Sequence, residues 1–223
     1  EKKRLRDEQK ELVRRFATPE VADELQSTGF ALGGKRVRAT VLFCDIRGFT
    51  TIAESQSPEE TIDLLNTWYT LMFDAIGGHG GVVTQMMGDG LMAVFGAPVA
   101  LAGHEVRAVG AAREMIELVA LYGREREAAG KPPIAIGIGI ATGEVVAGYA
   151  GTSARATYTC IGDTVNLAAR LEAHTKVAGR PILVDAANNS VEIIWGSRQW
   201  AVGNGLSERP TAYCLLPTAF NSE

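Results

Sequence analysis

The chain has 223 residues and a hydrophobic content of 46%, which is enough to bury the core of one globular domain with a short appendage. Its net charge of −4 offers no electrostatic basis for binding nucleic acid or an anionic membrane surface. The three cysteines are widely spaced and form no Cys-x-x-Cys pair, which favours reduced thiols in a cytoplasmic domain. No apolar run reaches the length of a membrane span, and no signal peptide is visible.

The first part of the chain is dense in charged residues. Residues 1–16 have only a sparse apolar seam, which suits a connector helix or a short coiled coil, with a solvated, frayed terminus as the alternative. Thr18 and Pro19 then have the residue types of an N-cap and a first helical position. We therefore expect residues 1–30 to form a connector helix and linker from an upstream regulatory region, followed by a loop over residues 29–38.

The remainder of the chain alternates between strand-like and helix-like segments. Apolar runs and β-type composition predict strands over residues 38–45, 81–86, 91–95, 133–142, 144–149, 157–161 and 181–184, with further strands near Trp200 and Tyr213. Helical spacing of apolar residues predicts helices over residues 57–76, 100–129 and 164–176. The strands on either side of Gly143 are expected to pair as a hairpin. This order predicts an α+β, ferredoxin-like (split βαβ) layer with additions.

Two aspartates lie where strand-like runs end. Asp45 closes the apolar run that begins at Ala39, and Asp89 lies between Gly88 and Gly90 at the tip of a predicted hairpin. Because carboxylates are unusual at the ends of buried strands, we interpret the two as a candidate site for divalent cations and therefore for phosphate chemistry. A plain turn role for Asp89 remains open, since Asp-Gly is common in hairpins.

The segment after Asp45 predicts a turn into a helix. Gly48 allows backbone N–H groups to approach an anion closely, and a helix N-terminus favours phosphate. Phe49 and Thr50, the next residues, are therefore candidates for binding an anionic substrate.

A second polar cluster lies on the helix predicted over residues 164–176. Asn166 and Arg170 are four residues apart and so project from one helix face. An amide and a guanidinium on one face can hold a sugar oxygen and a phosphate, whereas the alternative is an ordinary solvated helix face. Asp163 is expected to be the N-cap of this helix and not a ligand.

Three segments in order, residues 42–50, 87–96 and 159–170, resemble the class III nucleotidyl (adenylyl/guanylyl) cyclases of bacterial type. The resemblance covers residues 39–217, which we take as the catalytic domain. Residues 14–22 are also similar to the short linker helix that precedes many bacterial cyclase domains, which usually follow a sensor or membrane region. We therefore expect a cytoplasmic domain of a parent protein that carries such a region.

The resemblance implies roles for five residues. Asp45, Asp89 and the carbonyl of Ile46 match the ligands of two Mg²⁺ or Mn²⁺ ions in each active site. Asn166 matches the residue that orients the ribose, and Arg170 matches the residue that stabilises negative charge on the phosphates. In this family a head-to-tail homodimer forms two sites, with the aspartates supplied by one chain and the Asn, the Arg and the residues that read the base by the other.

The nucleotide is where this chain departs from the family pattern. At the first base-reading position, Lys is typical of adenylyl cyclases and Glu of guanylyl cyclases, but this chain has Gln85. At the second position it has Thr159, where adenylyl cyclases carry Asp or Thr and guanylyl cyclases often carry Cys. Glutamine offers both a donor and an acceptor and so could serve either base. An outward polar strand residue without a ligand role remains the alternative for Gln85.

A second departure lies in residues 200–210, which contain no counterpart of the family's phosphate-binding lysine, although Arg209 is a candidate replacement. The predicted function is an adenylyl cyclase that converts ATP to 3′,5′-cyclic AMP and pyrophosphate. The alternatives are a guanylyl or dual-specificity cyclase, with GTP as substrate, and a catalytically silent signalling or dimerisation module.

Overall fold

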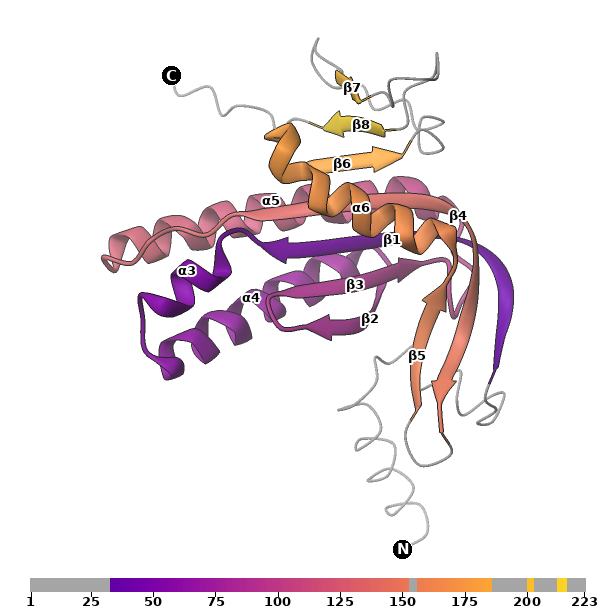
Figure 1. The fold of residues 1–223 in the computed structure, drawn as a ribbon, viewed down its shortest axis with the longest axis horizontal. Helices are drawn as coiled ribbons and strands as arrows, with labels where there is room; N and C mark the ends of the chain where they lie inside the picture. The colour runs from indigo at the N-terminus through magenta and orange to yellow at the C-terminus, as the bar shows by residue number, and fades with distance from the viewer. Residues whose placement is uncertain (1–32, 153–155, 186–199, 203–211, 216–223) are drawn as a thin grey trace, which may run out of the picture.

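A mixed β-sheet forms the centre of this computed structural model, which describes residues 33–152, 156–185, 200–202 and 212–215 (Figure 1). Its eight strands follow the order β2-β3-β1-β4-β6-β8-β7, and β5 pairs with β4 beside this path. The strands are β1 (Gly33–Ile46), β2 (Val82–Met87), β3 (Gly90–Phe95), β4 (Ile136–Gly151), β5 (Ala156–Ile161), β6 (Ile182–Asp185), β7 (Trp200–Val202) and β8 (Ala212–Leu215). The predicted connector over residues 1–30 and the position of Arg209 lie outside the described residues.

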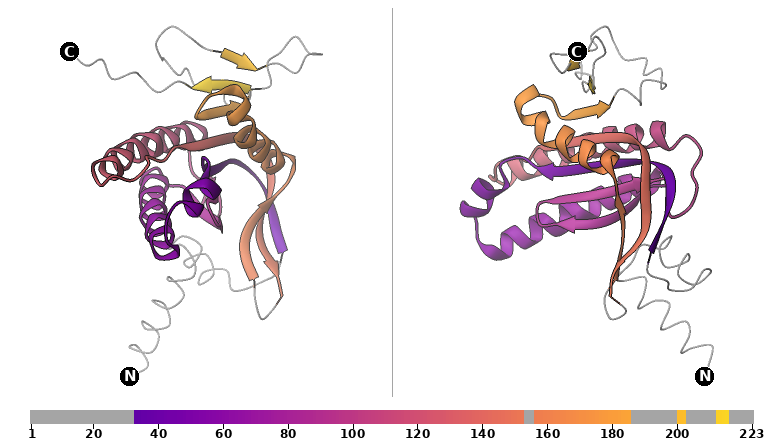
Figure 2. Two further views of the ribbon diagram at one scale, coloured as in Figure 1. Left: turned by 60° about the vertical axis from the view of Figure 1, so that its left-hand side comes forward. Right: turned by 45° about the vertical axis from the view of Figure 1, so that its right-hand side comes forward.

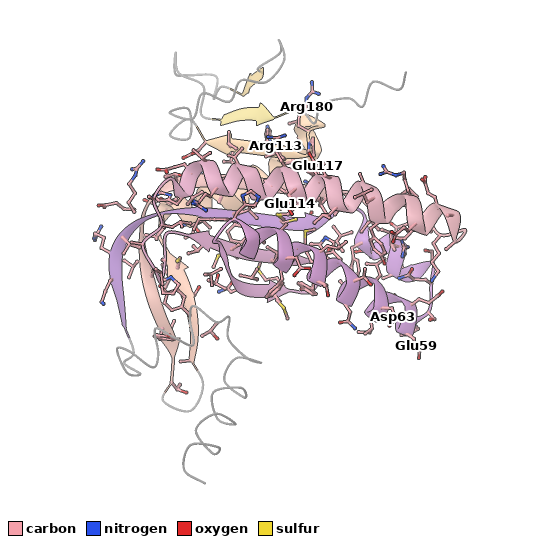
Figure 3. The ribbon with its side chains drawn as sticks, turned by 180° about the vertical axis from the view of Figure 1, so that it is seen from behind. Glu59, Asp63, Arg113, Glu114, Glu117 and Arg180 are labelled. Atoms are coloured by element: carbon pink, nitrogen blue, oxygen red, sulfur yellow. The ribbon has the colours of Figure 1, made fainter. Side chains whose placement is uncertain are left out.

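The helices cover both faces of this sheet. They are α3 (Phe49–Glu54), α4 (Pro58–Gly78), α5 (His104–Ala128) and α6 (Asp163–Ala178). Helices α4 and α5 share one buried cluster with one set of alternating strand residues, and α6 shares a second cluster with the other set. Figure 3 shows α5 from its outer side, where the charged residues Arg113, Glu114 and Glu117 are labelled. The single sheet between helical layers confirms the predicted α+β class.

The start of α4 shows how local sequence sets an element. Ser57 accepts a hydrogen bond from the backbone N–H of Glu60, and the Glu60 carboxylate accepts one from the N–H of Ser57. This reciprocal capping box, with Pro58 at the first helical position, satisfies amides that the helix itself cannot. The predicted helix start at Ser57 is confirmed.

The region around Gly143 differs from the prediction. The expected hairpin of two strands is wrong, because β4 is one continuous strand that pairs with β1 from Ile136 opposite Ile46 to Tyr149 opposite Gly33. A side chain at position 143 would come within 2.5 Å of the hydroxyl of Thr164, so the glycine serves close packing of α6 and not a turn. The expected loop over residues 29–38 is likewise corrected, since β1 already begins at Gly33.

The outer halves of β1 and β4 extend into an arm that β5 completes. Strand β5 pairs with β4 from Val146 opposite Ile161 to Gly151 opposite Ala156. Figure 2 shows these strands projecting away from the main sheet. The arm thus presents β5 beside the edge of the domain that carries β2.

The start of α6 differs by one residue from the sequence prediction. The predicted N-cap at Asp163 is wrong: Gly162 occupies the cap at φ 152°, a conformation that favours glycine, and Asp163 is the first helical residue. The prediction of reduced thiols agrees with Cys44 and Cys160, which are buried and free, whereas the side chain of Cys214 lies outside the described part of the structure. No helix among the described residues is both long and apolar enough to cross a membrane.

Candidate functional site

The pairing of β1 with β3 brings the two candidate aspartates together. Asp45 lies directly opposite Gly90 in the antiparallel register, and the N–H of Ile46 donates to the carbonyl of Asp89 at 2.9 Å. A Cβ at position 90 would lie 3.1 Å from the carbonyl oxygen of Cys44, so glycine allows this close approach. Two carboxylates predicted from separate sequence patterns therefore share one edge of the sheet.

The donor set at this edge suits a hard divalent cation. Both aspartates are partly exposed, and the Asp89 carboxylate makes no hydrogen bond or ion pair with another described residue. Carboxylate and carbonyl oxygens are the ligands that Mg²⁺ and Mn²⁺ prefer, with water and phosphate oxygens completing the coordination. Among the described residues, no cluster of three or more His, Cys, Asp or Glu side chains provides a closed metal site. Asp45, Asp89 and the Ile46 carbonyl thus fit an open cation site that would leave coordination positions for other ligands.

Tyr69 of α4 holds the turn that carries Asp89. Its hydroxyl donates to the carbonyl of Gly88 at 2.7 Å and lies 3.2 Å from the carbonyl of Gly90. Burial raises the pKa of Tyr69, and the negative charge of Asp89 raises it further. Tyr69 lies within the helix predicted over residues 57–76, and only the tertiary contact reveals its polar role.

Charged residues surround Asp45. Nη1 of Arg47 lies 3.1 Å from Oδ1 of Asp45 and 3.1 Å from Oε1 of Glu172, the second contact being an ion pair without hydrogen-bond alignment. Nζ of Lys176 lies 3.8 Å from Oδ2 of Asp45. Burial raises the pKa of Glu172 to about 7, and the negative charge of Asp45 adds to this effect. Sequence reasoning missed this network, because Arg47 and Glu172 are 125 residues apart.

The two base-reading candidates are joined by a hydrogen bond. Nε2 of Gln85 on β2 donates to Oγ1 of Thr159 on β5 at 2.9 Å, although 74 residues separate them. Both side chains are partly buried. Their contact places the amide and the hydroxyl at one point, where they can act as a single recognition pair.

The helix candidates lie apart from the aspartates. Asn166 and Arg170 are exposed on α6, and their side chains make no hydrogen bond or ion pair with any other described residue. The opposite side of α6 is buried through Ala168 and Leu171. Within one chain, therefore, neither side chain contacts Asp45 or Asp89 among the described residues.

The segment after Asp45 forms the predicted turn and helix. Gly48 adopts φ 66° at the N-cap of α3, a conformation that favours glycine, and no side chain caps the first amides of this helix. Phe49 packs against the main core, whereas Thr50 is exposed. The exposed amide end of α3 follows directly from the strand that ends at Asp45 and Ile46.

This combination of sheet order, covering helices and neighbouring aspartates agrees with the class III nucleotidyl cyclase resemblance. The chain belongs to the adenylate and guanylate cyclase catalytic domain family, whose profile matches residues 35–189. The resemblance stated from sequence motifs is therefore confirmed.

Relatives of known name include cyclases for both purine nucleotides. Adenylate cyclase 1 of Rhizobium meliloti is 37% identical over 152 residues, which are 68% of this chain but only 23% of that protein. The crystal structure of the guanylyl cyclase Cya2 matches with a TM-score of 0.72 at 32% identity, covering 82% of this chain and 93% of that one. The adenylyl cyclase CyaB from P. aeruginosa matches with a TM-score of 0.73 at 30% identity, covering 86% and 100%. The family is thus established, while its members differ in substrate.

Proposed function

We propose that this domain converts ATP to 3′,5′-cyclic AMP and pyrophosphate at sites formed between two head-to-tail copies of the chain. The observation that carries the proposal is the meeting of Asp45 and Asp89 at one edge of the sheet. In the reaction, the ribose 3′-oxygen bonds to the α-phosphorus and loses its proton. The bond from the α-phosphorus to the bridging oxygen breaks, and pyrophosphate leaves.

Each candidate residue has a separate task in this proposal. Asp45, Asp89 and the Ile46 carbonyl would hold two Mg²⁺ or Mn²⁺ ions, which when bound supply activation of the 3′-hydroxyl and neutralise charge on the triphosphate. Asn166 of the second copy orients the ribose, and Arg170 of that copy stabilises charge that develops on the phosphates.

The amide end of α3 gives the triphosphate a further contact. The backbone at Phe49 and Thr50 follows Gly48, whose missing side chain allows a phosphate to approach. This contact binds the substrate but leaves the choice of base to other residues.

Dimerisation is supported by groups that a single chain leaves exposed. Asn166 and Arg170 project from α6 into solvent, and the apolar side chains of Met86, Met87 and Ile161 are exposed on β2 and β5. Exposed apolar side chains on neighbouring strands suit a protein interface. A second copy would cover them and bring its own Asn166 and Arg170 to the aspartates.

The contact between Gln85 and Thr159 supports relaxed base selection. With Nε2 of Gln85 engaged, its Oε1 is left to accept and the Thr159 hydroxyl hydrogen is left to donate. Adenine offers a donor at N6 and an acceptor at N1, whereas guanine offers a donor at N1 and an acceptor at O6. A mispaired polar group costs about 1–3 kcal/mol, so we propose ATP as the main substrate and GTP as a side substrate.

One assay tests the reaction and the substrate together. The purified chain is incubated with Mn²⁺ and, separately, ATP, GTP, CTP and UTP, and the products are identified by mass spectrometry. We expect cyclic AMP as the main product and cyclic GTP as a lesser one. A larger yield of cyclic GTP would favour the guanylyl cyclase alternative, and no cyclic product from any nucleotide would favour a silent signalling or dimerisation module.

A further inference from the structure

Arg47 lies between two carboxylates that come from different elements of the fold. Asp45 lies one residue before the end of β1 and Glu172 lies on α6, and one nitrogen of Arg47 is 3.1 Å from an oxygen of each. The three side chains are only 19%, 26% and 14% exposed for Arg47, Asp45 and Glu172. Ion pairs shielded to this degree are screened less than pairs on an open surface and hold a more defined geometry.

The surrounding backbone is built to accommodate Arg47. The second terminal nitrogen of its guanidinium group donates to the backbone carbonyl of Glu172 at 3.3 Å. The backbone N–H of Arg47 donates to the carbonyl of Ala135 at 2.7 Å. A Cβ at Gly137 would collide with the guanidinium, and a Cβ at Gly139 would collide with the backbone of Glu172. The two glycines of β4 thus leave room for Arg47 and for close contact with α6.

We infer that Arg47, held in place by Glu172, is a positioning residue for the Asp45 carboxylate. Arg47 binds Oδ1 of Asp45, which leaves Oδ2 for a cation, and the position of Lys176 Nζ at 3.8 Å shows that a positive group can approach Oδ2. The inference rests on the proposed function for the role of Asp45. It also connects the metal-binding end of β1 to α6, the helix that presents Asn166 and Arg170 to the opposite site.

If Arg47 acted on the metal site only through its charge, its removal would strengthen metal binding, whereas a positioning role predicts weaker binding. A positive charge beside a metal ligand repels the metal, so removing Arg47 would then tighten metal binding. Lys176 provides the matched comparison, because it is also a cation beside Asp45 but is 58% exposed and forms one long ion pair with the described residues. Positioning therefore predicts that Arg47→Met weakens metal binding, whereas Lys176→Met does not.

The test measures binding of Mn²⁺ alone to the full chain, using electron paramagnetic resonance to count free Mn²⁺. We expect Arg47→Met to weaken binding by about 10- to 100-fold, the usual effect of losing a partner that orients a metal ligand. Lys176→Met should bind Mn²⁺ as tightly as the wild type or more tightly. Unchanged or tighter binding by Arg47→Met would overturn the inference.

Further variants separate positioning from loss of the fold. Arg47→Lys keeps the charge but lacks the second guanidinium nitrogen that donates to the carbonyl of Glu172, so we expect intermediate Mn²⁺ affinity, and affinity equal to wild type would overturn the inference. Glu172→Gln should also weaken binding. Arg36→Met, which removes an exposed ion pair with Glu144, should leave binding unchanged. If Arg47→Met does not unfold cooperatively in a thermal melt, the Mn²⁺ affinity of Arg47→Lys tests the positioning role in its place.

The same measurements distinguish this inference from the proposed reaction, because Mn²⁺ binding needs no turnover. Wild-type chain that binds Mn²⁺ but forms no cyclic nucleotide would refute the reaction and leave the positioning role standing. Asp45→Ala that binds Mn²⁺ as tightly as the wild type would refute the ligand role of Asp45, and the positioning role with it. Loss of binding in Asp45→Ala together with tighter binding in Arg47→Met would refute only the positioning role.

Discussion

At the scale of single residues, we expect the hydroxyl of Tyr69 to stabilise the turn that carries Asp89 by a measurable amount. Tyr69→Phe removes only the hydroxyl that bonds the carbonyl of Gly88 and lies near that of Gly90. We expect the free energy of unfolding to fall by about 1 kcal/mol, because a typical hydrogen bond contributes that much and two carbonyls lose a donor. Urea denaturation followed by circular dichroism measures this change.

Tyr122 on α5 provides the control for that substitution. Its ring lies beside the guanidinium of Arg126, with the ring centre 5.9 Å away, but its hydroxyl makes no hydrogen bond to a described residue. Tyr122→Phe should therefore change the unfolding free energy by less than about 0.5 kcal/mol. Equal losses in the two variants would contradict the role assigned to Tyr69.

At the scale of elements, a buried polar chain links the start of α5 to the sheet. Nδ1 of His104 lies 2.8 Å from the hydroxyl of Thr40, and that hydroxyl lies 2.6 Å from the hydroxyl of Thr142. Burial lowers the pKa of His104; Glu105 opposes this shift and the positive charge of Arg38 adds to it. The folded state therefore favours the neutral imidazole.

The direction of that shift predicts how stability depends on pH. The folded pKa of His104 lies below the unfolded value of 6.5. The contribution of the neutral His104 side chain to folding stability is therefore fully present above pH 6.5 and is lost as the pH falls through the folded pKa. We expect His104→Gln to unfold with a weaker dependence on pH below 6.5 than the wild type. Chemical denaturation at a series of pH values measures the unfolding free energy of both proteins. An equal change of unfolding free energy with pH in the wild type and in His104→Gln would contradict the prediction.

The close packing of α6 against β4 leads to a second prediction at the scale of elements, on the stability of a variant at Gly139. Gly139→Ala would place a methyl group against the backbone of Glu172 and Ala168, where a rigid helix cannot yield easily. We expect a loss of about 2–4 kcal/mol in unfolding free energy, typical of severe overpacking. Differential scanning calorimetry would report it as a lower Tm.

Gly77 in the last turn of α4 is the matched control, because an added Cβ there meets nothing within 4 Å. Gly77→Ala should leave stability unchanged or raise it by up to about 1 kcal/mol, since alanine favours a helix more than glycine does. A similar loss for both alanine variants would show that the close contact at Gly139 is not the cause.

At the scale of the whole molecule, the proposed shared site predicts complementation between two inactive variants. Asp45→Ala removes a metal ligand and Arg170→Ala removes charge stabilisation, so each homodimer should lose at least about 100-fold in activity. A mixed dimer would keep one complete site, and mixing the two purified variants should restore cyclase activity.

The control for complementation is mixing Asp45→Ala with Asp89→Ala. Both changes lie in the same half of the site, so every dimer would lack a metal ligand in both of its sites. In the mixed dimer both sites are damaged, and no activity should return. Recovery in this control, or none in the first mixture, would contradict the head-to-tail arrangement.

The order of the motifs and the type of most elements were determined by the sequence alone. Ser57 and Glu60 cap α4 from three residues apart, and the runs ending at Asp45 and Asp89 define strand ends, because capping and periodicity act over a few residues. The roles of Asn166 and Arg170 rest on motif matching and remain predictions.

Only the tertiary structure decided which distant groups meet. Gly143 looks like a turn locally, yet pairing with β1 and packing against α6 keep β4 continuous through it. Arg47 and Glu172 carry no local signal of their contact across 125 residues. Such contacts arise when the whole sheet and its helices close around the core, because the burial that stabilises them involves segments that are separate in the chain.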